Sequence, residues 1–168
     1  MELGCGNGRD AIYFHQKGFC VTEIDQTTAE INLLKNQYPS ICFLSGDFTN
    51  LNHFQLPLFD VIYSRFTLHS INENDENHLL KNIPCFLPQN GLLAIEARGL
   101  NNSLFGKGKK IAPNSFIYEG HFRRFIDFEH LKEKLKEYFV LEYAQEKEGF
   151  APFLNQNDVF FRLLARKK

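Results

Sequence analysis

The sequence lacks the features that define several common classes of protein. No apolar run approaches the roughly 20 residues that a membrane-spanning helix needs. The net charge of −1 shows none of the basic excess typical of nucleic-acid-binding proteins. There is no tryptophan, so the 18 phenylalanines shift the expected core toward packing of phenyl rings. We therefore expect no membrane or nucleic-acid partner, and 168 residues are enough for one domain with a buried core.

The cysteines also lack the paired spacing of a metal site, so we expect no bound metal. There are four of them, at Cys5, Cys20, Cys42 and Cys85. Three lie in apolar, strand-like stretches, which predicts buried and reduced thiols. Met1 opens directly on a motif, so we expect no signal peptide and a cytoplasmic protein.

That motif is the stretch MELGCGNGRD, with glycines at positions 4, 6 and 8 before a predicted helix at 10–17. Glycines in such a turn let a ligand approach the backbone, and the helix start favours an anionic or nucleotide-type ligand. An ordinary glycine-rich turn is the alternative. The dinucleotide fingerprint needs another glycine where this chain has Arg9, which disfavours a nicotinamide-dependent oxidoreductase.

The rest of the chain alternates predicted strands and helices. Strands are expected at 19–24, 41–47 and 59–66, a turn followed by a strand within 87–98, and helices at 27–37 and 73–83. A helix at 127–138 and strands at 139–145 and 159–166 complete the pattern, which favours a parallel sheet. Asp25 closes the second strand 17 residues after Gly8, near the spacing at which an acid meets a ribose. Capping of the following helix is the alternative role for Asp25.

Two stretches resemble the class I S-adenosylmethionine-dependent methyltransferases. They are E-x-G-x-G-x-G at 2–8, which is similar to motif I, and L-P-x-x-G-x-L at 87–93. The resemblance implies an α/β, doubly wound fold with a seven-stranded, mostly parallel sheet, an antiparallel last strand and helices on both faces. It also implies one methyltransferase domain over 1–168, with S-adenosylmethionine as cofactor and S-adenosylhomocysteine as product. By comparison with the family, we expect the usual N-terminal lid segment to be missing, either because the start is truncated or because the lid comes from elsewhere. We expect 98–126 to be a substrate-loop insertion.

The resemblance also assigns cofactor-binding residues. Asp25 would hold the ribose, Asp47 the adenine amino group, and Phe48 would flank the adenine ring, unless it is simply a core residue. The full set expected at the cofactor is Glu2, Gly4, Cys5, Gly6, Asn7, Asp25, Gln26, Asp47, Phe48 and Ser64.

The end of the predicted strand at 59–66 bears on the reaction, because reactive groups lie at this edge of open α/β sheets. The chain reads YSRF at 63–66, not the N/D-P-P-Y/F/W of adenine-methylating enzymes, and its only Pro-Cys lies at 84–85, at the opposite end of the sheet. Both nucleic-acid base chemistries are therefore disfavoured. His69 follows the strand and titrates near neutrality, as a general base must, or it packs against the next helix.

The long segment at 98–126 has no clear periodicity, which is typical of functional loops. It holds the glycine-lysine stretch 106–110 and an aromatic-basic cluster at 118–125, so it is either a substrate lid or a solvated basic loop. Guanidinium groups there would suit a carboxylate or phosphate. Candidates for catalysis or acceptor binding are therefore Arg65, His69, Arg98, His121, Arg123 and Arg124.

These cations favour a small anionic acceptor, methylated at oxygen. Residues 120–125 are similar to methyltransferases of bacterial surface-polysaccharide gene clusters, which makes a sugar-linked acceptor a related expectation. The alternative function is a catalytically silent S-adenosylmethionine-binding module, or a subunit of a heteromeric enzyme.

Overall fold

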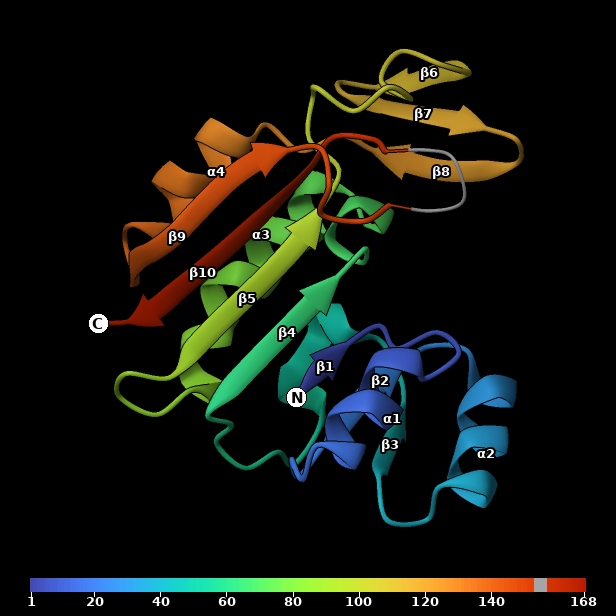
Figure 1. Cartoon of the computed structure of the whole chain (residues 1–168), viewed down its shortest axis with the longest axis vertical. Helices are drawn as coiled ribbons and strands as arrows, with labels where there is room; N and C mark the ends of the chain where they lie inside the picture. Colours follow the sequence, from blue (N-terminus) through green and yellow to red (C-terminus); the bar gives the residue numbers. More distant parts are fainter. Residues whose placement is uncertain (153–156) are drawn as a thin grey trace.

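A seven-stranded sheet forms the centre of the computed structural model, which describes residues 1–152 and 157–168 (Figure 1). The strand order is β3-β2-β1-β4-β5-β10-β9. Strands β1 to β5 are parallel, and β10 runs antiparallel between β5 and β9. The predicted sheet is therefore confirmed. Its strands are β1 (Glu2–Leu3), β2 (Thr22–Asp25), β3 (Cys42–Ser45), β4 (Val61–Arg65), β5 (Leu92–Ala97), β9 (Phe139–Lys147) and β10 (Phe160–Lys167).

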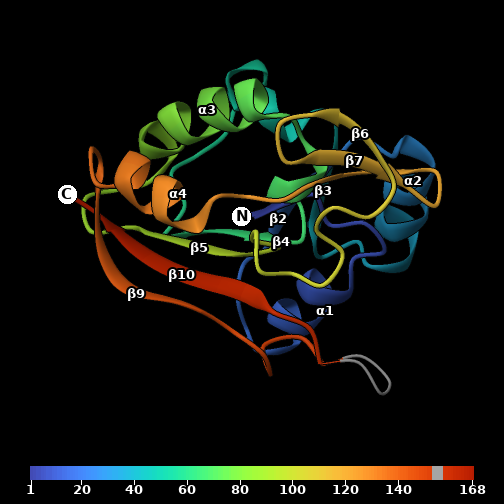
Figure 2. The same cartoon turned by 90° about the horizontal axis from the view of Figure 1, so that it is seen from above.

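Helices cover both faces of this sheet, also as predicted. Seen from above, α1 lies on one side of the sheet while α3 and α4 lie on the other (Figure 2). The helices are α1 (Arg9–Gln16), α2 (Thr28–Gln37), α3 (Glu73–Asn82) and α4 (Phe128–Leu135), with short 3₁₀ turns η1 (Phe48–His53), η2 (Leu68–Ser70) and η3 (Ile83–Phe86).

The main core takes one fully buried aliphatic residue from each central strand, at Leu3, Ile24, Ile62 and Leu93. The large buried phenylalanines are Phe125, Phe139 and Phe161. Phe161 stacks on Phe128 of α4, with ring centroids 4.7 Å apart. Phenyl rings therefore fix α4 against the sheet, as the composition predicted. No helix within the described residues is long and apolar enough to span a membrane.

The segment 98–126 is more ordered than its sequence suggested. It contains a three-stranded antiparallel sheet of β6 (Lys109–Ala112), β7 (Ser115–Tyr118) and β8 (His121–Arg124), which lies beyond the carboxyl ends of β4 and β5 (Figure 1). Asn114, Glu119 and Gly120 have φ angles of 52°, 51° and 75°. Such left-handed residues are typical of the tight turns of β-hairpins. We call this small sheet the hairpin sheet.

The prediction that most of the thiols are buried is wrong, because only one of the four cysteines is buried. Cys5 is buried, whereas Cys20, Cys42 and Cys85 are exposed. Cys42 belongs to β3, an edge strand, and points away from the core that Phe43 enters. Cys20 and Cys85 lie outside the sheet strands, so their apolar neighbours do not enclose them.

Candidate active site

The glycine-rich turn joins β1 to α1 at the carboxyl edge of the sheet (Figure 1). Gly4, Gly6 and Gly8 have φ angles of 73°, 54° and 71°, a conformation that glycine adopts at little cost. A Cβ atom at Gly4 would clash with Thr67, and one at Gly8 would lie 2.8 Å from Leu34. A Cβ atom at Gly6 would meet open space. The outer two glycines therefore pack the turn onto the domain, and Gly6 leaves its backbone open to a ligand.

Asp25, the last residue of β2, fastens this turn to the neighbouring strand. One carboxylate oxygen accepts a hydrogen bond from Gly6 N at 3.0 Å, and the other accepts one from Thr27 N at 2.8 Å. The second contact fits the alternative role of Asp25 at the start of α2. An ionised carboxylate has about four lone-pair sites, so both oxygens can also accept ribose hydroxyl protons. Gln26 beside it is exposed.

Asp47 and Phe48 follow β3 at the same edge. The Asp47 carboxylate accepts hydrogen bonds from Thr49 N at 2.9 Å, from Thr49 Oγ1 at 2.7 Å and from Asn50 Nδ2 at 3.0 Å. Slight burial acts to raise the pKa of Asp47, but these hydrogen bonds and nearby His53 lower it. Asp47 is therefore an exposed carboxylate, able to meet an amino group. Phe48 is 8% exposed and packs beneath Gly4, so its ring offers little surface to a base.

Ser64 and Asn7, two further predicted cofactor residues, differ in exposure. Asn7 is exposed in the turn, where its side-chain oxygen accepts a hydrogen bond from Arg9 N at 3.3 Å. Ser64 is fully buried, and its hydroxyl lies 2.6 Å from that of Thr67. The prediction is therefore wrong for the Ser64 side chain, which instead holds Thr67 against the turn.

Glu2 and Cys5 are also buried, beside an acid that the sequence analysis did not single out. Glu2 lies opposite Glu23 in the parallel pairing of β1 with β2, and the two are 5% and 0% exposed. Glu2 Oε2 and both Glu23 oxygens lack a hydrogen-bond partner among the described residues. Burial, reinforced by Glu23, raises the pKa of Glu2 to about 10, and burial also raises the pKa of Glu23. Glu2 therefore holds its proton at neutral pH, and both side chains are buried away from the surface that a cofactor would contact.

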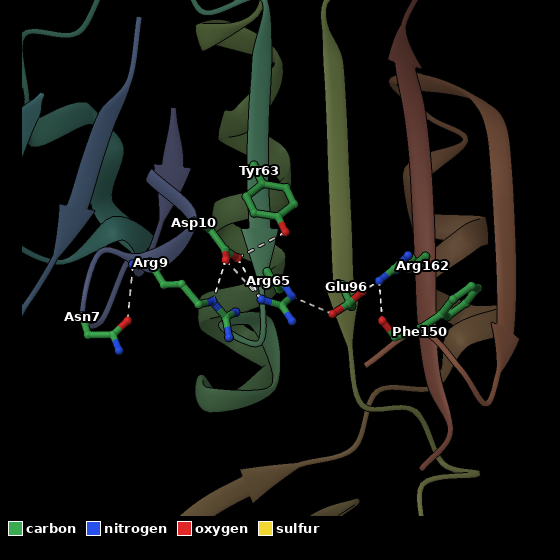
Figure 3. Close-up of polar contacts among 8 residues, drawn as sticks. All are labelled: Asn7, Arg9, Asp10, Tyr63, Arg65, Glu96, Phe150 and Arg162. Atoms are coloured by element: carbon green, nitrogen blue, oxygen red, sulfur yellow. Dashed lines mark hydrogen bonds and ion pairs between the residues drawn. The ribbon is translucent and has the colours of Figure 1, made fainter. Parts of the chain in front are cut away.

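A row of charged side chains crosses the carboxyl ends of β4 and β5 and the amino end of β10, and it includes Arg65 (Figure 3). Arg65 Nε lies 2.8 Å from Glu96 Oε1, and Arg65 Nη1 lies 3.0 Å from Asp10 Oδ2. Arg162 bonds the other Glu96 oxygen. Two carboxylates thus neutralise Arg65, which favours a structural role, and its predicted catalytic role stays an untested prediction. It ties α1 to β4 and β5.

Arg124 is likewise engaged inside the protein. Its guanidinium is almost fully buried, pairs with Glu76 of α3, and donates to the carbonyl oxygens of Ile71 at 2.8 Å and Leu68 at 3.1 Å. The Nε and Nη2 atoms of Arg124 are thus used within the domain, which favours a structural role, and its catalytic assignment stays an untested prediction. Arg124 fixes the hairpin sheet to η2 and α3.

His69 and Arg98 lie together where β4 and β5 end. Arg98 Nη1 is 2.6 Å from His69 Nε2, and Arg98 N is 3.3 Å from His69 Nδ1. His69 is 4% exposed, and burial, then the charges of Arg98, Arg123 and Arg124, lowers its pKa well below the usual value. A neutral imidazole has one acceptor nitrogen, and Arg98 occupies it. The general-base role predicted for His69 is therefore wrong, and the alternative, a packing role, fits.

Arg98 and Arg123 remain as the free cations of the site. Ile126 N donates to Arg98 O at 3.0 Å, so the segment that follows Arg123 runs beside Arg98. Burial, then the charge of Arg123, lowers the pKa of Arg98. Neither forms an ion pair with a carboxylate in the described chain, and the Nε atom of each is buried without a partner. Arg98 lies 5.8 Å from the centroid of the Phe66 ring and 5.5 Å from that of Phe160. His121 is exposed on β8, two residues before Arg123.

Comparison with known proteins identifies the fold that carries this site. Residues 1–91, which include the glycine turn, Asp25 and Asp47, match the family described as methyltransferase domain. The chain belongs to this family. The resemblance to class I methyltransferases is thereby confirmed, and with it S-adenosylmethionine as the cofactor.

The relatives of this methyltransferase extend the match in sequence and in fold. An uncharacterized methyltransferase of Alkaliphilus oremlandii is 26% identical over 95 residues, which are 56% of this chain and 43% of that protein. The match thus spans less than half of the length of that curated relative. A SAM-dependent methyltransferase of Methanosarcina mazei has the same fold, with a TM-score of 0.83 at 18% identity over 99% of this chain and 90% of that one.

The third similar protein is known from a structure with a bound small molecule. It is the 1,6-didemethyltoxoflavin-N1-methyltransferase of Burkholderia thailandensis, with bound 1,6-didemethyltoxoflavin and S-adenosylhomocysteine. Its TM-score is 0.70 at 20% identity, over 99% of this chain and 69% of that one.

The residues of the methyltransferase fit S-adenosylmethionine. Gly6 is open where a side chain would obstruct a ligand, Asp25 keeps free acceptor capacity, and Asp47 is an exposed carboxylate. All three lie at the carboxyl edge of the sheet, where ligands of open α/β folds bind. The individual contacts of these residues with ribose and adenine remain predictions.

Proposed function

We propose that this protein transfers the methyl group of S-adenosylmethionine to an oxygen of a small anionic acceptor. The observation that supports the anionic acceptor is the pair of cations Arg98 and Arg123, which no described carboxylate neutralises. Like charges in a partly buried site repel, so an anion between them lowers the energy of the site. The small-molecule acceptor of the Burkholderia enzyme supports the size class.

The reaction requires little from the protein beyond alignment of the acceptor with the methyl group of the cofactor. The sulfonium cofactor supplies an already activated methyl group, so the protein must orient the acceptor and exclude water. Gly6, Asp25 and Asp47 would hold the cofactor, and Arg98 and Arg123 would orient the acceptor oxygen. An anionic oxygen is nucleophilic without a general base, which is consistent with a neutral His69 held by Arg98.

A methyl-transfer assay with labelled S-adenosylmethionine and a panel of phosphates, carboxylates and neutral alcohols tests this function. We expect turnover with anions only, and a loss of at least tenfold in Arg123→Ala with unchanged affinity for S-adenosylhomocysteine. Arg123→Lys should recover part of the activity, because lysine keeps the charge but not the two-pronged geometry. Arg166→Ala is the matched control, since Arg166 pairs with Glu142 near the opposite end of β10.

The same assay distinguishes the proposed methyl transfer from the alternative function. Tight cofactor binding without turnover on any acceptor would favour a silent binding module or a subunit of a heteromeric enzyme. A sugar-linked acceptor of surface-polysaccharide synthesis rests only on the resemblance of residues 120–125, and remains a prediction.

A further inference from the structure

The hairpin sheet has one cationic face, which follows from its strand register. Lys110 lies opposite Phe116, and Phe116 lies opposite Arg123. Directly paired residues of an antiparallel sheet point to the same face, so Lys110 and Arg123 share one. His121 shares it as well, because alternate residues of a strand point the same way. We call this surface the cationic face; it comprises Lys110, Phe116, Tyr118, His121 and Arg123, and Phe116 is buried against the Phe105 ring between the two cations.

The opposite face holds the hairpin sheet in a fixed orientation. It carries Arg124, whose buried guanidinium bonds Glu76 and two carbonyl oxygens of the domain. Ser115, paired with Arg124, is buried there too. Because this face is anchored to α3 and η2, the cationic face is held toward Arg98. Arg123 belongs to both groups: it lies 5.9 Å from the Tyr118 ring centroid, and its charge acts on Arg98 and His69.

The cationic face has no internal counterion. No ion pair in residues 1–152 and 157–168 involves Lys110, His121 or Arg123. Glu119, in the turn after β7, is exposed and forms no ion pair either. The surface cations of β9 and β10, by contrast, include Arg162 and Arg166, which are both paired with glutamates.

The positions of these cations indicate an extended ligand. Strand β7 separates Lys110 from Arg123, so their Cα atoms lie about 10 Å apart, at about 4.8 Å per strand spacing. A single phosphate or carboxylate is too small to neutralise both ends of this face. We propose that the acceptor carries two separated anionic groups, one held by Arg98 and Arg123 and the other by Lys110. This inference rests on the proposed function and specifies its substrate class.

Two commercial sugars provide a matched pair of probes, used with the full chain in the presence of S-adenosylhomocysteine. Fructose 1,6-bisphosphate carries phosphates at both ends, and fructose 6-phosphate carries one. By calorimetry we expect the bisphosphate to bind at least tenfold more tightly. Lys110→Ala should weaken the bisphosphate about tenfold and leave the monophosphate unchanged.

Lys109→Ala is the control, because Lys109 neighbours Lys110 in the same exposed strand but pairs with Ile117 on the other face. It should change neither affinity, and melting temperatures should show that both variants are folded. Equal affinities of the two sugars, or equal effects of the two lysine variants, would overturn the two-anion proposal. If Arg123→Ala leaves the monophosphate affinity unchanged, the anionic acceptor itself is refuted.

Discussion

The buried carboxyl pair Glu2–Glu23 predicts an unusual dependence of stability on pH. The raised pKa values mean that the folded protein keeps protons on the pair which the unfolded chain releases above pH 4.5. The stabilising protonated form is therefore fully effective below pH 4.5, and its contribution is lost as the pH rises toward 10. When the folded state binds one more proton than the unfolded state, the free energy of unfolding falls by at most about 1.4 kcal/mol for each unit of rising pH, or about 3 kcal/mol between pH 6 and 8.

Replacing Glu23 by glutamine tests this reasoning. Glutamine keeps the size, removes one ionisable group and can donate a hydrogen bond to Glu2. We expect urea unfolding at pH 6, 7 and 8 to show a shallower pH dependence for Glu23→Gln, and a stability at pH 8 about 1–3 kcal/mol above that of the wild type. Glu129→Gln, at a side chain that is 79% exposed, should change nothing. Identical pH slopes for the wild type and Glu23→Gln would refute the raised pKa values of the buried pair.

Three further substitutions follow from the site. Asp25→Ala should weaken S-adenosylhomocysteine binding by about 1.5–3 kcal/mol in calorimetry, because hydrogen bonds to a charged group are lost; an unchanged Kd would place the ribose elsewhere. His69→Gln should lower the rate of methyl transfer but preserve its pH profile, since His69 supports Arg98 and takes no proton. If the wild type loses activity below pH 6–7 and His69→Gln does not, His69 acts as a base and this reasoning is contradicted. Arg124→Ala should destabilise the fold by roughly 3–5 kcal/mol in thermal or urea unfolding, because it leaves Glu76 buried without its arginine, and a change below 1 kcal/mol would argue against the anchor.

The glycine turn could be predicted because its signal is local. Three glycines and an acid within seven residues specify positive φ angles, and the strand-helix alternation specifies the sheet. The carboxylates Asp25 and Asp47 could be placed in the same way, since Asp25 ends one strand and Asp47 comes two residues after the next, both at the known edge. Their contacts within two or three residues of themselves are also set locally.

The pairing of the arginines could not be predicted, because it depends on contacts between distant residues. Arg65 meets Asp10 from 55 positions away, and Arg124 meets Glu76 from 48 positions away. Arg123 and Arg124 are neighbours in β8 and have similar sequence surroundings. Because successive residues of a strand point to opposite faces, their environments are nevertheless opposite. Glu23 did carry a signal: it is an acid inside a short apolar strand, directly before Ile24.

A crystal structure of the protein with S-adenosylhomocysteine and sulfate tests the central claim most directly. We expect the ribose hydroxyls to contact Asp25, the cofactor to lie over the backbone of Gly6, and a sulfate to lie between Arg98 and Arg123 in contact with both guanidinium groups. A cofactor bound away from the glycine turn would contradict the cofactor site. A bound cofactor with no anion between the two arginines, at sulfate concentrations that occupy other surface cations, would contradict the anionic acceptor.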